Sequence, residues 1–363
     1  MIAKDTKKQW MDYCYSEIES LKAILQELGF TLDEEQIHIG GERYAFSEKK
    51  LVLLGRRLAD NMRVIIKVSS DAKGIAEIKH ERQSRQMLAK IKFAYHVFFT
   101  PEEILYQQIE GRVIFITKYI EQDCQFLERD IKEQFFLALK GLEVQEGVQV
   151  TTYEHAHDIS QYFGIWQADS YLQKFSEYQK TVSNLLADQP NVLALYDKAQ
   201  IFLAQNKEII DLYVGFLTHW DFVPHNLRVN NGNIYLLDHS SIRFGSKHEA
   251  WARFINFMCL YNPELAKYLL FYIAKNRPAS ESLSLQTMRV YRLAEIIWHY
   301  ANTLERADIE LKKLNIERIN FWSQALAAVL GGNELDEKII LDYKNQRDSL
   351  RSTEEKKRQE KLH

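Results

Sequence analysis

The sequence predicts an α+β protein with two lobes, in which a small lobe on a five-stranded antiparallel sheet precedes a larger, mainly helical lobe. Short apolar runs separated by polar turns, which are typical of strands, occupy the first third of the chain, and helical periodicity dominates afterwards. The 363 residues are enough for two such lobes, and 46% hydrophobic residues with only 5 prolines indicate a folded chain. We place the lobes at residues 1–120 and 121–345, followed by a charged tail at 346–363.

The small lobe is expected to begin with a helix over residues 5–28. Apolar residues from Trp10 onward recur at spacings of three and four, and Gly29 ends this stripe. The runs QIHIGG, KLVLLGRRL and MRVIIKVS then predict three antiparallel strands. Asp71 can cap the one central helix of the lobe, over about residues 72–91, and EILYQ and RVIFITKYI supply the last two strands.

The large lobe has a helical pattern apart from one span, which contains THWDFVPHN at residues 218–226 and RVNNGNIYLLD shortly after it. In the second segment, two apolar arms flank Asn231-Gly232, a pair suited to the positive φ of a tight turn, so a β-hairpin is expected. Strand pairing would bring Asn226 and Asp238, near the outer ends of this hairpin, close together in space.

The overall charge and the cysteine content exclude several kinds of partner. With 47 basic and 50 acidic residues, the net charge of -3 creates no field toward nucleic acid or an anionic membrane. Cys14, Cys124 and Cys259 form no CxxC pair, which argues against a disulfide framework or a structural zinc site. No apolar run suits a signal peptide or a membrane span, so we expect a soluble, cytoplasmic protein of undetermined oligomeric state. The charged tail predicts a solvated helix end or a frayed segment without function.

Three oxygen-bearing side chains in the central span suggest metal-assisted chemistry. Asp221, Asn226 and Asp238 offer two carboxylates and an amide oxygen, which are hard ligands. Such ligands in small number suit Mg²⁺ whose coordination is completed by water and phosphate oxygens. In phosphoryl transfer the protein mainly positions the nucleophile and neutralises charge, and it uses these residue types to do so.

The order D-x-x-x-x-N, hairpin, then Asp, with His219 two residues before the first Asp, resembles the protein-kinase-like superfamily. The closer resemblance is to the aminoglycoside phosphotransferase and choline kinase-like family of small-molecule kinases, whose loop reads HGDxxxxN where this sequence reads HWDFVPHN. The resemblance implies a bilobal kinase-like fold, the use of ATP and Mg²⁺, and a small-molecule hydroxyl acceptor. It implies that Asp221 is the catalytic residue that orients the acceptor hydroxyl, and that Asn226 and Asp238 hold the metal.

The resemblance extends upstream to the nucleotide-binding parts of this family. Lys67 ends the apolar run VIIK of the third predicted strand, where the family keeps the lysine that contacts the α- and β-phosphates. The following helix carries Glu77 and Glu81, either of which can pair with this lysine, and the distance along the chain favours Glu81.

Two backbone segments complete the expected nucleotide site. The turn at Gly40-Gly41 corresponds to the loop that covers the phosphates, although it is far from a full glycine-rich loop. The segment FITKYIEQ corresponds to the hinge between the lobes, which places Tyr119 and Ile120 where backbone groups meet adenine.

A degenerate kinase-like module that binds nucleotide without turnover is an alternative. The short glycine turn supports it, and so does the sequence after Asp238, which is His239-Ser240 where protein kinases have Phe-Gly. Trp220 also replaces a small residue of the catalytic loop. Against this alternative stands the presence of the lysine and all three oxygen ligands.

A histidine-metal hydrolase is the third hypothesis, because four histidines gather in one region: His219, His225, His239 and His248. Structural hydrogen bonding is the simpler interpretation of these side chains. Glu249 is a candidate brace of the catalytic loop or contact of the acceptor. Tyr291, Trp298 and Trp322 lie on helical stripes, which indicates core packing rather than an acceptor pocket.

Overall fold

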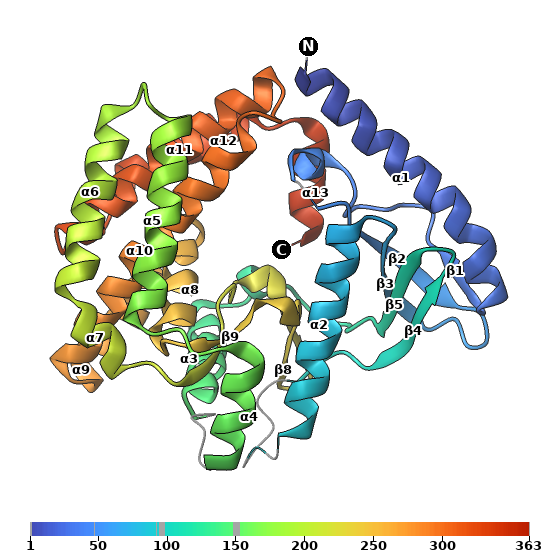
Figure 1. The fold of residues 1–363 in the computed structure, drawn as a ribbon, viewed down its shortest axis with the longest axis horizontal. Helices are drawn as coiled ribbons and strands as arrows, with labels where there is room; N and C mark the ends of the chain where they lie inside the picture. Colours follow the sequence, from blue (N-terminus) through green and yellow to red (C-terminus); the bar gives the residue numbers. More distant parts are fainter. Residues whose placement is uncertain (1, 47, 92, 94–98, 148–152, 363) are drawn as a thin grey trace.

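The computed structural model describes residues 2–46, 48–91, 93, 99–147 and 153–362. Figure 1 shows the sheet with helices α1 and α2 on one side of the molecule and the long helices of the C-terminal half on the other. The fold class expected from the sequence is confirmed, since a five-stranded sheet forms the first lobe and helices dominate the second.

The sheet is antiparallel throughout, with its strands in the order β1-β2-β3-β5-β4. The strands are β1 (Phe30–Leu32), β2 (Leu51–Arg57), β3 (Arg63–Ser69), β4 (Glu103–Ile109) and β5 (Arg112–Lys118). Successive residues of a strand point to opposite faces, so alternation decides which residues are available to a ligand. Leu53 and Ile66 are buried in the core beneath α1, whereas Val52 and Lys67 occupy the other face.

The first strand is not where the sequence predicted it. The run QIHIGG forms no strand, and β1 (Phe30–Leu32) pairs with the edge of β2 instead. The reason lies in the side chain of Gln36, which accepts from Leu54 N–H and donates to Leu54 carbonyl, each at 2.8 Å. This side-chain amide takes both backbone hydrogen bonds of Leu54 on β2, where a further strand would have paired. The chain then turns into a short 3₁₀ helix, η1 (Gly41–Ala45).

Two helices cover the two faces of this sheet. The apolar face of α1 (Ile2–Glu27) packs on the sheet through residues such as Leu21 and Leu25, in a core that also contains Leu311 of the C-terminal half. The helix α2 (Ala72–Lys90) starts as predicted after Asp71, whose carboxylate accepts from the N–H groups of Lys73 and Gly74 at 3.0 and 3.2 Å.

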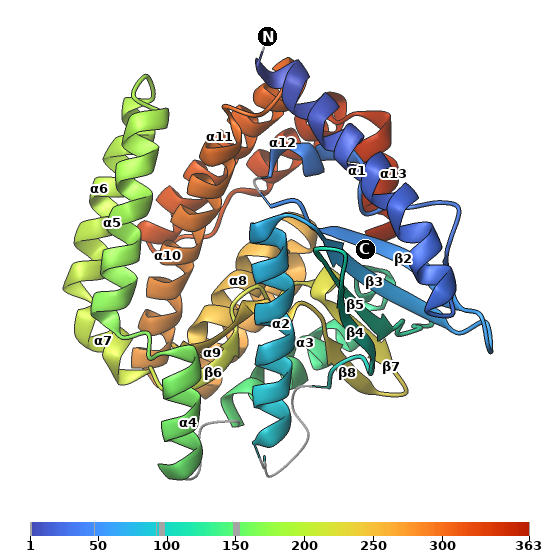
Figure 2. The ribbon, with the colours of Figure 1, turned by 45° about the vertical axis from the view of Figure 1, so that its right-hand side comes forward.

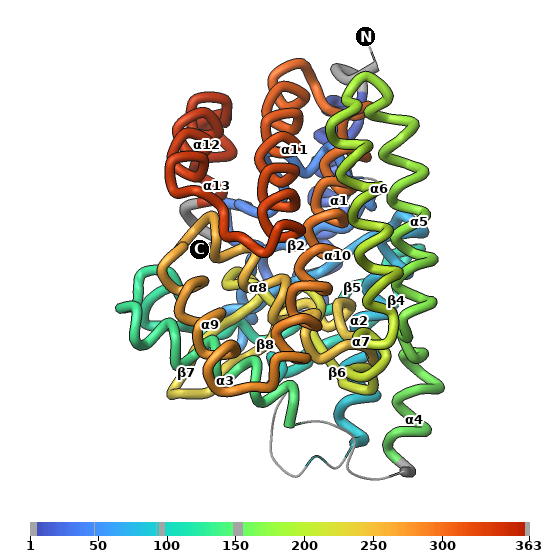
Figure 3. The backbone as a smooth tube through the Cα atoms, turned by 90° about the vertical axis from the view of Figure 1, so that its left-hand side faces the viewer, coloured from blue at the N-terminus to red at the C-terminus, as the bar shows by residue number. Residues whose placement is uncertain are grey.

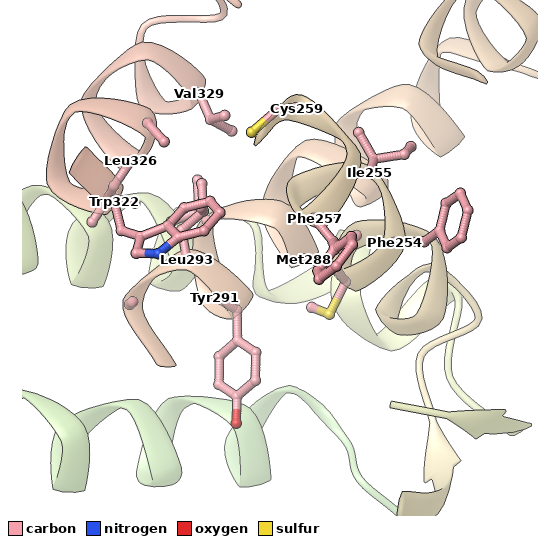
Figure 4. Packing of buried hydrophobic residues seen from close by; sticks show 14 of the residues in the cluster. Phe254, Ile255, Phe257, Cys259, Met288, Tyr291, Leu293, Trp322, Leu326 and Val329 are labelled. Carbon is pink, nitrogen blue, oxygen red and sulfur yellow. The ribbon is translucent and has the colours of Figure 1, made fainter. Parts of the chain in front are cut away.

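The large lobe is built on α8, α10 and α11, whose buried side chains meet in Figure 4. Trp251 and Tyr291 at its centre are 0% exposed. Figure 2 shows α5 and α6 on the outer side of this lobe, and Figures 1 and 3 show α11 between them and α12.

The helices beyond the small lobe are α3 (Ile131–Gly147), α4 (Tyr153–Phe163), α5 (Ala168–Leu185), α6 (Pro190–Gln205), α7 (Lys207–Leu212), α8 (His248–Tyr261), α9 (Pro263–Asn276), α10 (Ala279–Thr303), α11 (Ile309–Leu330), α12 (Glu337–Leu350) and α13 (Thr353–Leu362). Within the described residues, no helix combines the length and apolar character needed to cross a bilayer.

Two small pairs of strands interrupt the helices of the large lobe. The expected hairpin is confirmed as β7 (Leu227–Asn230) and β8 (Asn233–Leu236), with Asn231 and Gly232 at φ 50° and 72° in its turn. The second pair, β6 (Phe216–His219) with β9 (Ile242–Gly245), was not predicted. Short 3₁₀ helices lie at η2 (Phe126–Glu128), η3 (Pro224–Asn226) and η4 (His239–Ser241).

The charged tail is helical and most of its side chains are exposed, as expected for a solvated helix end, but one face of it is buried. Its last helix, α13, packs against η1 of the small lobe, and Glu355 within it is only 1% exposed. The carboxylates of Glu354 and Glu355 accept from the N–H groups of Gly41 and Glu42 in the small lobe, a contact that the charge pattern did not predict.

Candidate active site

A cavity of about 1110 Å³ separates the two lobes and brings together side chains from both. From the sheet and α2 it is lined by Lys50, Lys67 and Glu81. From the large lobe it is lined by the catalytic-loop span and the end of the hairpin, with Asp221, Asn226 and Asp238.

Lys67 pairs with Glu81 and not with Glu77. Its Nζ lies 2.6 and 2.5 Å from the two carboxylate oxygens of Glu81, whose side chain is 4% exposed. Pleating places Lys67 on the face of the sheet that α2 covers, and Glu81 lies two helical turns after Gly74 on the side of α2 that faces this sheet. Glu77 instead forms an ion pair with Lys50. A buried ammonium held by one carboxylate is thus fixed at the cavity wall.

Asp238 lies opposite these lysines in a conformation that few side chains adopt. Its φ of 55° and ψ of 64° are left-handed, which is uncommon for a residue other than glycine and often marks a functional position. Burial alone would raise the pKa of its carboxyl group, but the charges of Lys50 and Lys67 outweigh burial and lower this pKa to about 2. Ser240 Oγ donates to one carboxylate oxygen at 2.6 Å. Asp238 is therefore an anion fixed beside two cations.

Asn226 and Asp221 form one hydrogen-bonded unit at the base of the same cavity. Leu237 N–H donates to the Asn226 carbonyl at 2.9 Å, so the hairpin brings Asn226 next to Asp238 in space. The side-chain amide of Asn226 donates to Asp221 Oδ2 at 2.9 Å, and Arg253 Nε donates to Asp221 Oδ1 at 2.8 Å. Burial would raise the pKa of Asp221, but Arg253 and neighbouring cations hold it below its ordinary value.

Comparison with known proteins identifies the architecture in which this site lies. No protein-family model and no curated protein matches the chain. A thermostable mutant of aminoglycoside phosphotransferase APH(4)-Ia in its apo form matches with a TM-score of 0.57 at 15% identity, over 85% of this chain and 97% of that chain. The fold is that of the aminoglycoside phosphotransferases.

Other aminoglycoside phosphotransferases match over similar lengths. APH(2'')-Ib with bound ADP has a TM-score of 0.54 at 15% identity, over 78% of this chain and 92% of that chain. An APH(2'') complex with GDP and kanamycin has a TM-score of 0.55 at 12% identity, over 81% of this chain and 92% of that chain. In this aminoglycoside phosphotransferase fold the cavity lies at the boundary between the sheet lobe and the helical lobe.

The glycine turn departs from the expected arrangement. Gly41 N–H donates to Glu354 Oε1 at 2.9 Å, and the next N–H, of Glu42, donates to Glu355 Oε2 at 3.3 Å. Arg358 in turn pairs with Glu355 at 2.8 Å. Among the described residues around the cavity, the turn contributes Glu42 and the following arginine but neither glycine. A carboxylate of α13 therefore bonds the Gly41 amide, one of the two glycines that the sequence assigned to phosphate.

The hinge segment lines the cavity, but one of its amides is already bonded. Tyr119 and Ile120 both lie at the cavity wall. Tyr119 N–H donates to the Arg63 carbonyl at 3.0 Å, which continues the pairing of β5 with β3, and the Arg63 guanidinium lies 4.0 Å from the Tyr119 ring centroid. Val52 of the small lobe and Leu237 of the large lobe add apolar surface to the same cavity.

Two charged residues that the sequence interpretation missed belong to this site. Lys50 is 8% exposed and is the largest cationic influence on Asp238. Its signal was present, because a lysine that opens an apolar strand shares a strand face with every second residue after it. Arg253 lies four residues before Phe257 and eight before Tyr261 on one face of α8, and all three line the cavity. Nothing in the sequence alone connected this arginine to Asp221.

The histidines do not assemble a metal centre. Among the described residues, no three His, Cys, Asp or Glu side chains are grouped as metal ligands. His219 Nε2 lies 2.8 Å from the Leu237 carbonyl, and His248 Nδ1 lies 2.8 Å from Ser284 Oγ. Their roles in this structure are hydrogen bonds within the lobe.

The other residues that the sequence singled out are Glu249 and three aromatic side chains of the large lobe. Glu249 is fully buried and accepts from Arg243 at 2.6 Å and from the Tyr171 hydroxyl at 2.8 Å, so it braces the lobe. Tyr291 is in the core as expected. Trp322 is in the same core and Trp298 packs against it, as expected, and both rings also line the cavity.

Proposed function

We propose that the chain transfers the γ-phosphoryl group of ATP to a hydroxyl group of a small molecule. One observation carries the proposal: Lys67 with its partner Glu81, the anion Asp238, and the Asn226–Asp221 pair all line one cavity between the lobes. These are the residue types that phosphoryl transfer requires at the phosphates, at the metal and at the acceptor.

The nucleotide would lie along the sheet with its phosphates toward Lys67. The ammonium group would contact phosphate oxygens, and Glu81 would keep it in place, since the pair is almost fully buried. The donor chemistry at Asn226 and Asp238 fits Mg²⁺: the amide nitrogen of Asn226 is bonded to Asp221, which directs its oxygen away, and Ser240 engages only one carboxylate oxygen of Asp238. When bound there, Mg²⁺ would neutralise charge on the phosphates.

Asp221 would accept a hydrogen bond from the acceptor hydroxyl and orient its oxygen in line with the γ-phosphorus. As the new oxygen–phosphorus bond forms, the bond from the γ-phosphorus to the bridging oxygen of ADP breaks, and the hydroxyl proton passes to Asp221. The lowered pKa of Asp221 keeps this carboxyl group ionised before the reaction. Arg253 occupies one of its oxygens, so the acceptor hydroxyl would compete with or displace this contact.

A transfer assay tests the proposal. Hydroxylated metabolites and aminoglycosides would be incubated with the protein, Mg²⁺ and γ-labelled ATP, and labelled acceptor would be separated from free phosphate. We expect transfer to at least one acceptor, lowered about 10³-fold in Asp221→Ala and unchanged in Asp188→Ala, which removes an exposed aspartate. Equal transfer in wild type and Asp221→Ala would refute the role of Asp221.

A nucleotide-binding module without turnover is the second candidate, and two contacts favour it. Arg253 engages the proposed catalytic carboxylate, and Glu354 bonds the Gly41 amide. This candidate predicts that ATP raises the melting temperature without Mg²⁺ and that no acceptor promotes ATP consumption. The kinase proposal predicts the opposite result for both measurements.

A further inference from the structure

The helical side of the cavity carries an excess of positive charge. Arginines from the helical lobe and its tail line the wall: Arg253, Arg292, Arg318, Arg347, Arg351 and Arg358. Among the described residues of that lobe, the carboxylates that line the cavity are Asp221, Asp238 and Glu295, half as many as these arginines. A cavity wall of one sign attracts ligands of the opposite sign and repels those of its own.

Two of these arginines share a single carboxylate. Arg347 Nε lies 2.9 Å and Arg351 Nη1 lies 3.9 Å from Asp348 Oδ1, and the Asp348 side chain is 55% exposed. The two guanidinium side chains are each only 10% exposed. One solvated carboxylate therefore faces two largely buried cations, and among the described residues it is the one carboxylate that forms an ion pair with either of them.

Three side chains of the cavity wall carry buried donors without acceptors. Arg347 Nη1, Arg351 Nε and Trp322 Nε1 are buried and have no hydrogen-bond partner among the described residues. Trp322 and Arg347 are 5% and 8% exposed, and the indole nitrogen of Trp322 is visible in Figure 4. A buried donor without a partner is costly, and all three atoms can only donate. A ligand that supplies several oxygen acceptors would satisfy them together.

One face of α8 connects Arg347 to the proposed catalytic centre. Arg253 bonds Asp221, Phe257 follows one turn later, and Tyr261 one turn after that. The Phe257 and Tyr261 rings stack at 4.2 Å, and the Arg347 guanidinium lies 5.7 Å from the Tyr261 ring centroid. At a rise of 1.5 Å per residue, the eight residues from Arg253 to Tyr261 span about 12 Å. This span suits a small sugar with a charged substituent.

We infer that the acceptor is a hydroxylated anion whose phosphate monoester or carboxylate binds Arg347, Arg351 and Trp322 while a hydroxyl group of the same molecule lies at Asp221. The inference rests on the proposed function and deepens it by naming the acceptor class. A guanidinium fork matches the geometry of both kinds of oxyanion. A cationic amino sugar would meet the positive wall and is disfavoured.

Binding measurements test the acceptor class without requiring turnover. The full chain would be saturated with Mg²⁺ and AMP-PNP, so that the nucleotide site is filled, and titrated calorimetrically with matched pairs: glucose and glucose 6-phosphate, trehalose and trehalose 6-phosphate. Glucuronate separates carboxylate from phosphate recognition, and kanamycin represents the cationic class. We expect at least one anionic member to bind roughly tenfold or more tightly than its neutral partner.

Variants assign the binding to the named residues. Arg347→Gln with Arg351→Gln should weaken anion binding roughly tenfold or more, and Trp322→Phe, which removes one donor and keeps the ring, should weaken it less. Lys312→Gln with Lys338→Gln removes the same charge from exposed positions and should leave binding within about twofold. If the arginine double variant does not fold, as judged by circular dichroism, Trp322→Phe and Arg347→Lys supply the test, because Arg347→Lys keeps the charge and loses the fork.

The outcomes separate this inference from the proposed function. Anion binding that depends on Arg347 and Arg351, without phosphoryl transfer to any bound anion, would sustain the anion site and count against the kinase. Phosphoryl transfer to neutral or cationic acceptors that is insensitive to both arginines would sustain the kinase and overturn the anionic acceptor. Equal affinity within every pair, or no binding to any anion of the panel at millimolar concentration, would also overturn it.

Discussion

The catalytic loop and the glycine turn of the small lobe are held by contacts of very different range. In the loop, Asn226 bonds Asp221, which is five residues away. In the turn, Gly41 bonds Glu354, which is 313 residues away. Local contacts leave a pattern in the sequence, because spacing and turn residues determine them. The contact of Gly41 with α13 depends on how the two lobes dock, so the spacing of residues in the sequence does not predict it.

The same difference separates the two lysines that face Asp238. Lys67 and Glu81 lie on consecutive elements, β3 and α2, and bond each other at 2.6 and 2.5 Å. Lys50 lies directly before the neighbouring strand β2 and pairs with Glu77. The ammonium groups of both lysines lower the pKa of Asp238 and so favour its negative charge. The proposed function assigns the phosphate contact to Lys67 on β3, held by Glu81 of α2.

The largest expected effect tests these two pairs against each other. Lys67→Met and Glu81→Gln should each lower kcat/KM for ATP by roughly 10²-fold or more, because the phosphate-facing cation is removed or loses its buried partner. Glu77→Gln, the matched change in the other pair, should lower kcat/KM by less than tenfold. Steady-state kinetics with the acceptor found by the transfer assay would measure all three. A larger loss in Glu77→Gln would reverse the assignment of the two pairs.

A smaller effect is expected at the glycine turn, which α13 holds through Glu354 and Glu355. Glu355→Gln removes the charge that accepts from Arg358 and from the Glu42 amide, so the free energy of unfolding should fall by about 1 to 3 kcal/mol. Native-state amide exchange should accelerate at Glu42, whose N–H loses its charged acceptor, and less at Gly41, whose N–H bonds Glu354. Glu337→Gln, an exposed change on α12, is the control. Unchanged exchange at both amides would show that α13 does not hold this turn.

The smallest expected effect is the pH dependence that Asp238 confers. Its pKa of about 2 in the folded protein lies below its ordinary value of 3.8, so the unfolded chain binds a proton first as the pH falls. Its contribution to stability is therefore complete above about pH 4 and disappears as the pH falls toward 2. Urea unfolding should show a steeper loss of stability over this range in the wild type than in Asp238→Asn, by roughly 2 kcal/mol at most. Stability that falls equally with pH in the wild type and in Asp238→Asn would show that the two lysines do not lower the pKa of Asp238.

The sequence predicted those parts of the fold that depend on local patterns. Short apolar runs between polar turns placed four of the five strands of the sheet, the Asn231-Gly232 pair placed the hairpin, and Asp71 placed the start of α2. The first strand was misplaced because a side chain, that of Gln36, took the hydrogen bonds of a strand. Strand propensity describes the preferences of the backbone, so it does not predict a side chain that takes the place of a strand in hydrogen bonding.

For the candidate site, the sequence predicted which residue types gather but not all of their partners. Asp221, Asn226 and Asp238 line one cavity because a loop and a hairpin of fixed length bring them there. Arg253 reaches Asp221 only through the packing of α8 beneath the loop. The arginine-rich wall likewise combines helices far apart in the chain, so its charge was invisible in a net charge of -3.

The Mg²⁺ dependence of ATP binding tests the central claim most directly, because it does not depend on knowing the acceptor. Calorimetry would compare ATP affinity with and without Mg²⁺ in the wild type, in Asp238→Asn and in Asp188→Asn, an exposed control. The account predicts that Mg²⁺ tightens ATP binding roughly tenfold or more in the wild type and the control, and that Asp238→Asn loses most of this gain. The same gain in Asp238→Asn as in the wild type would contradict it.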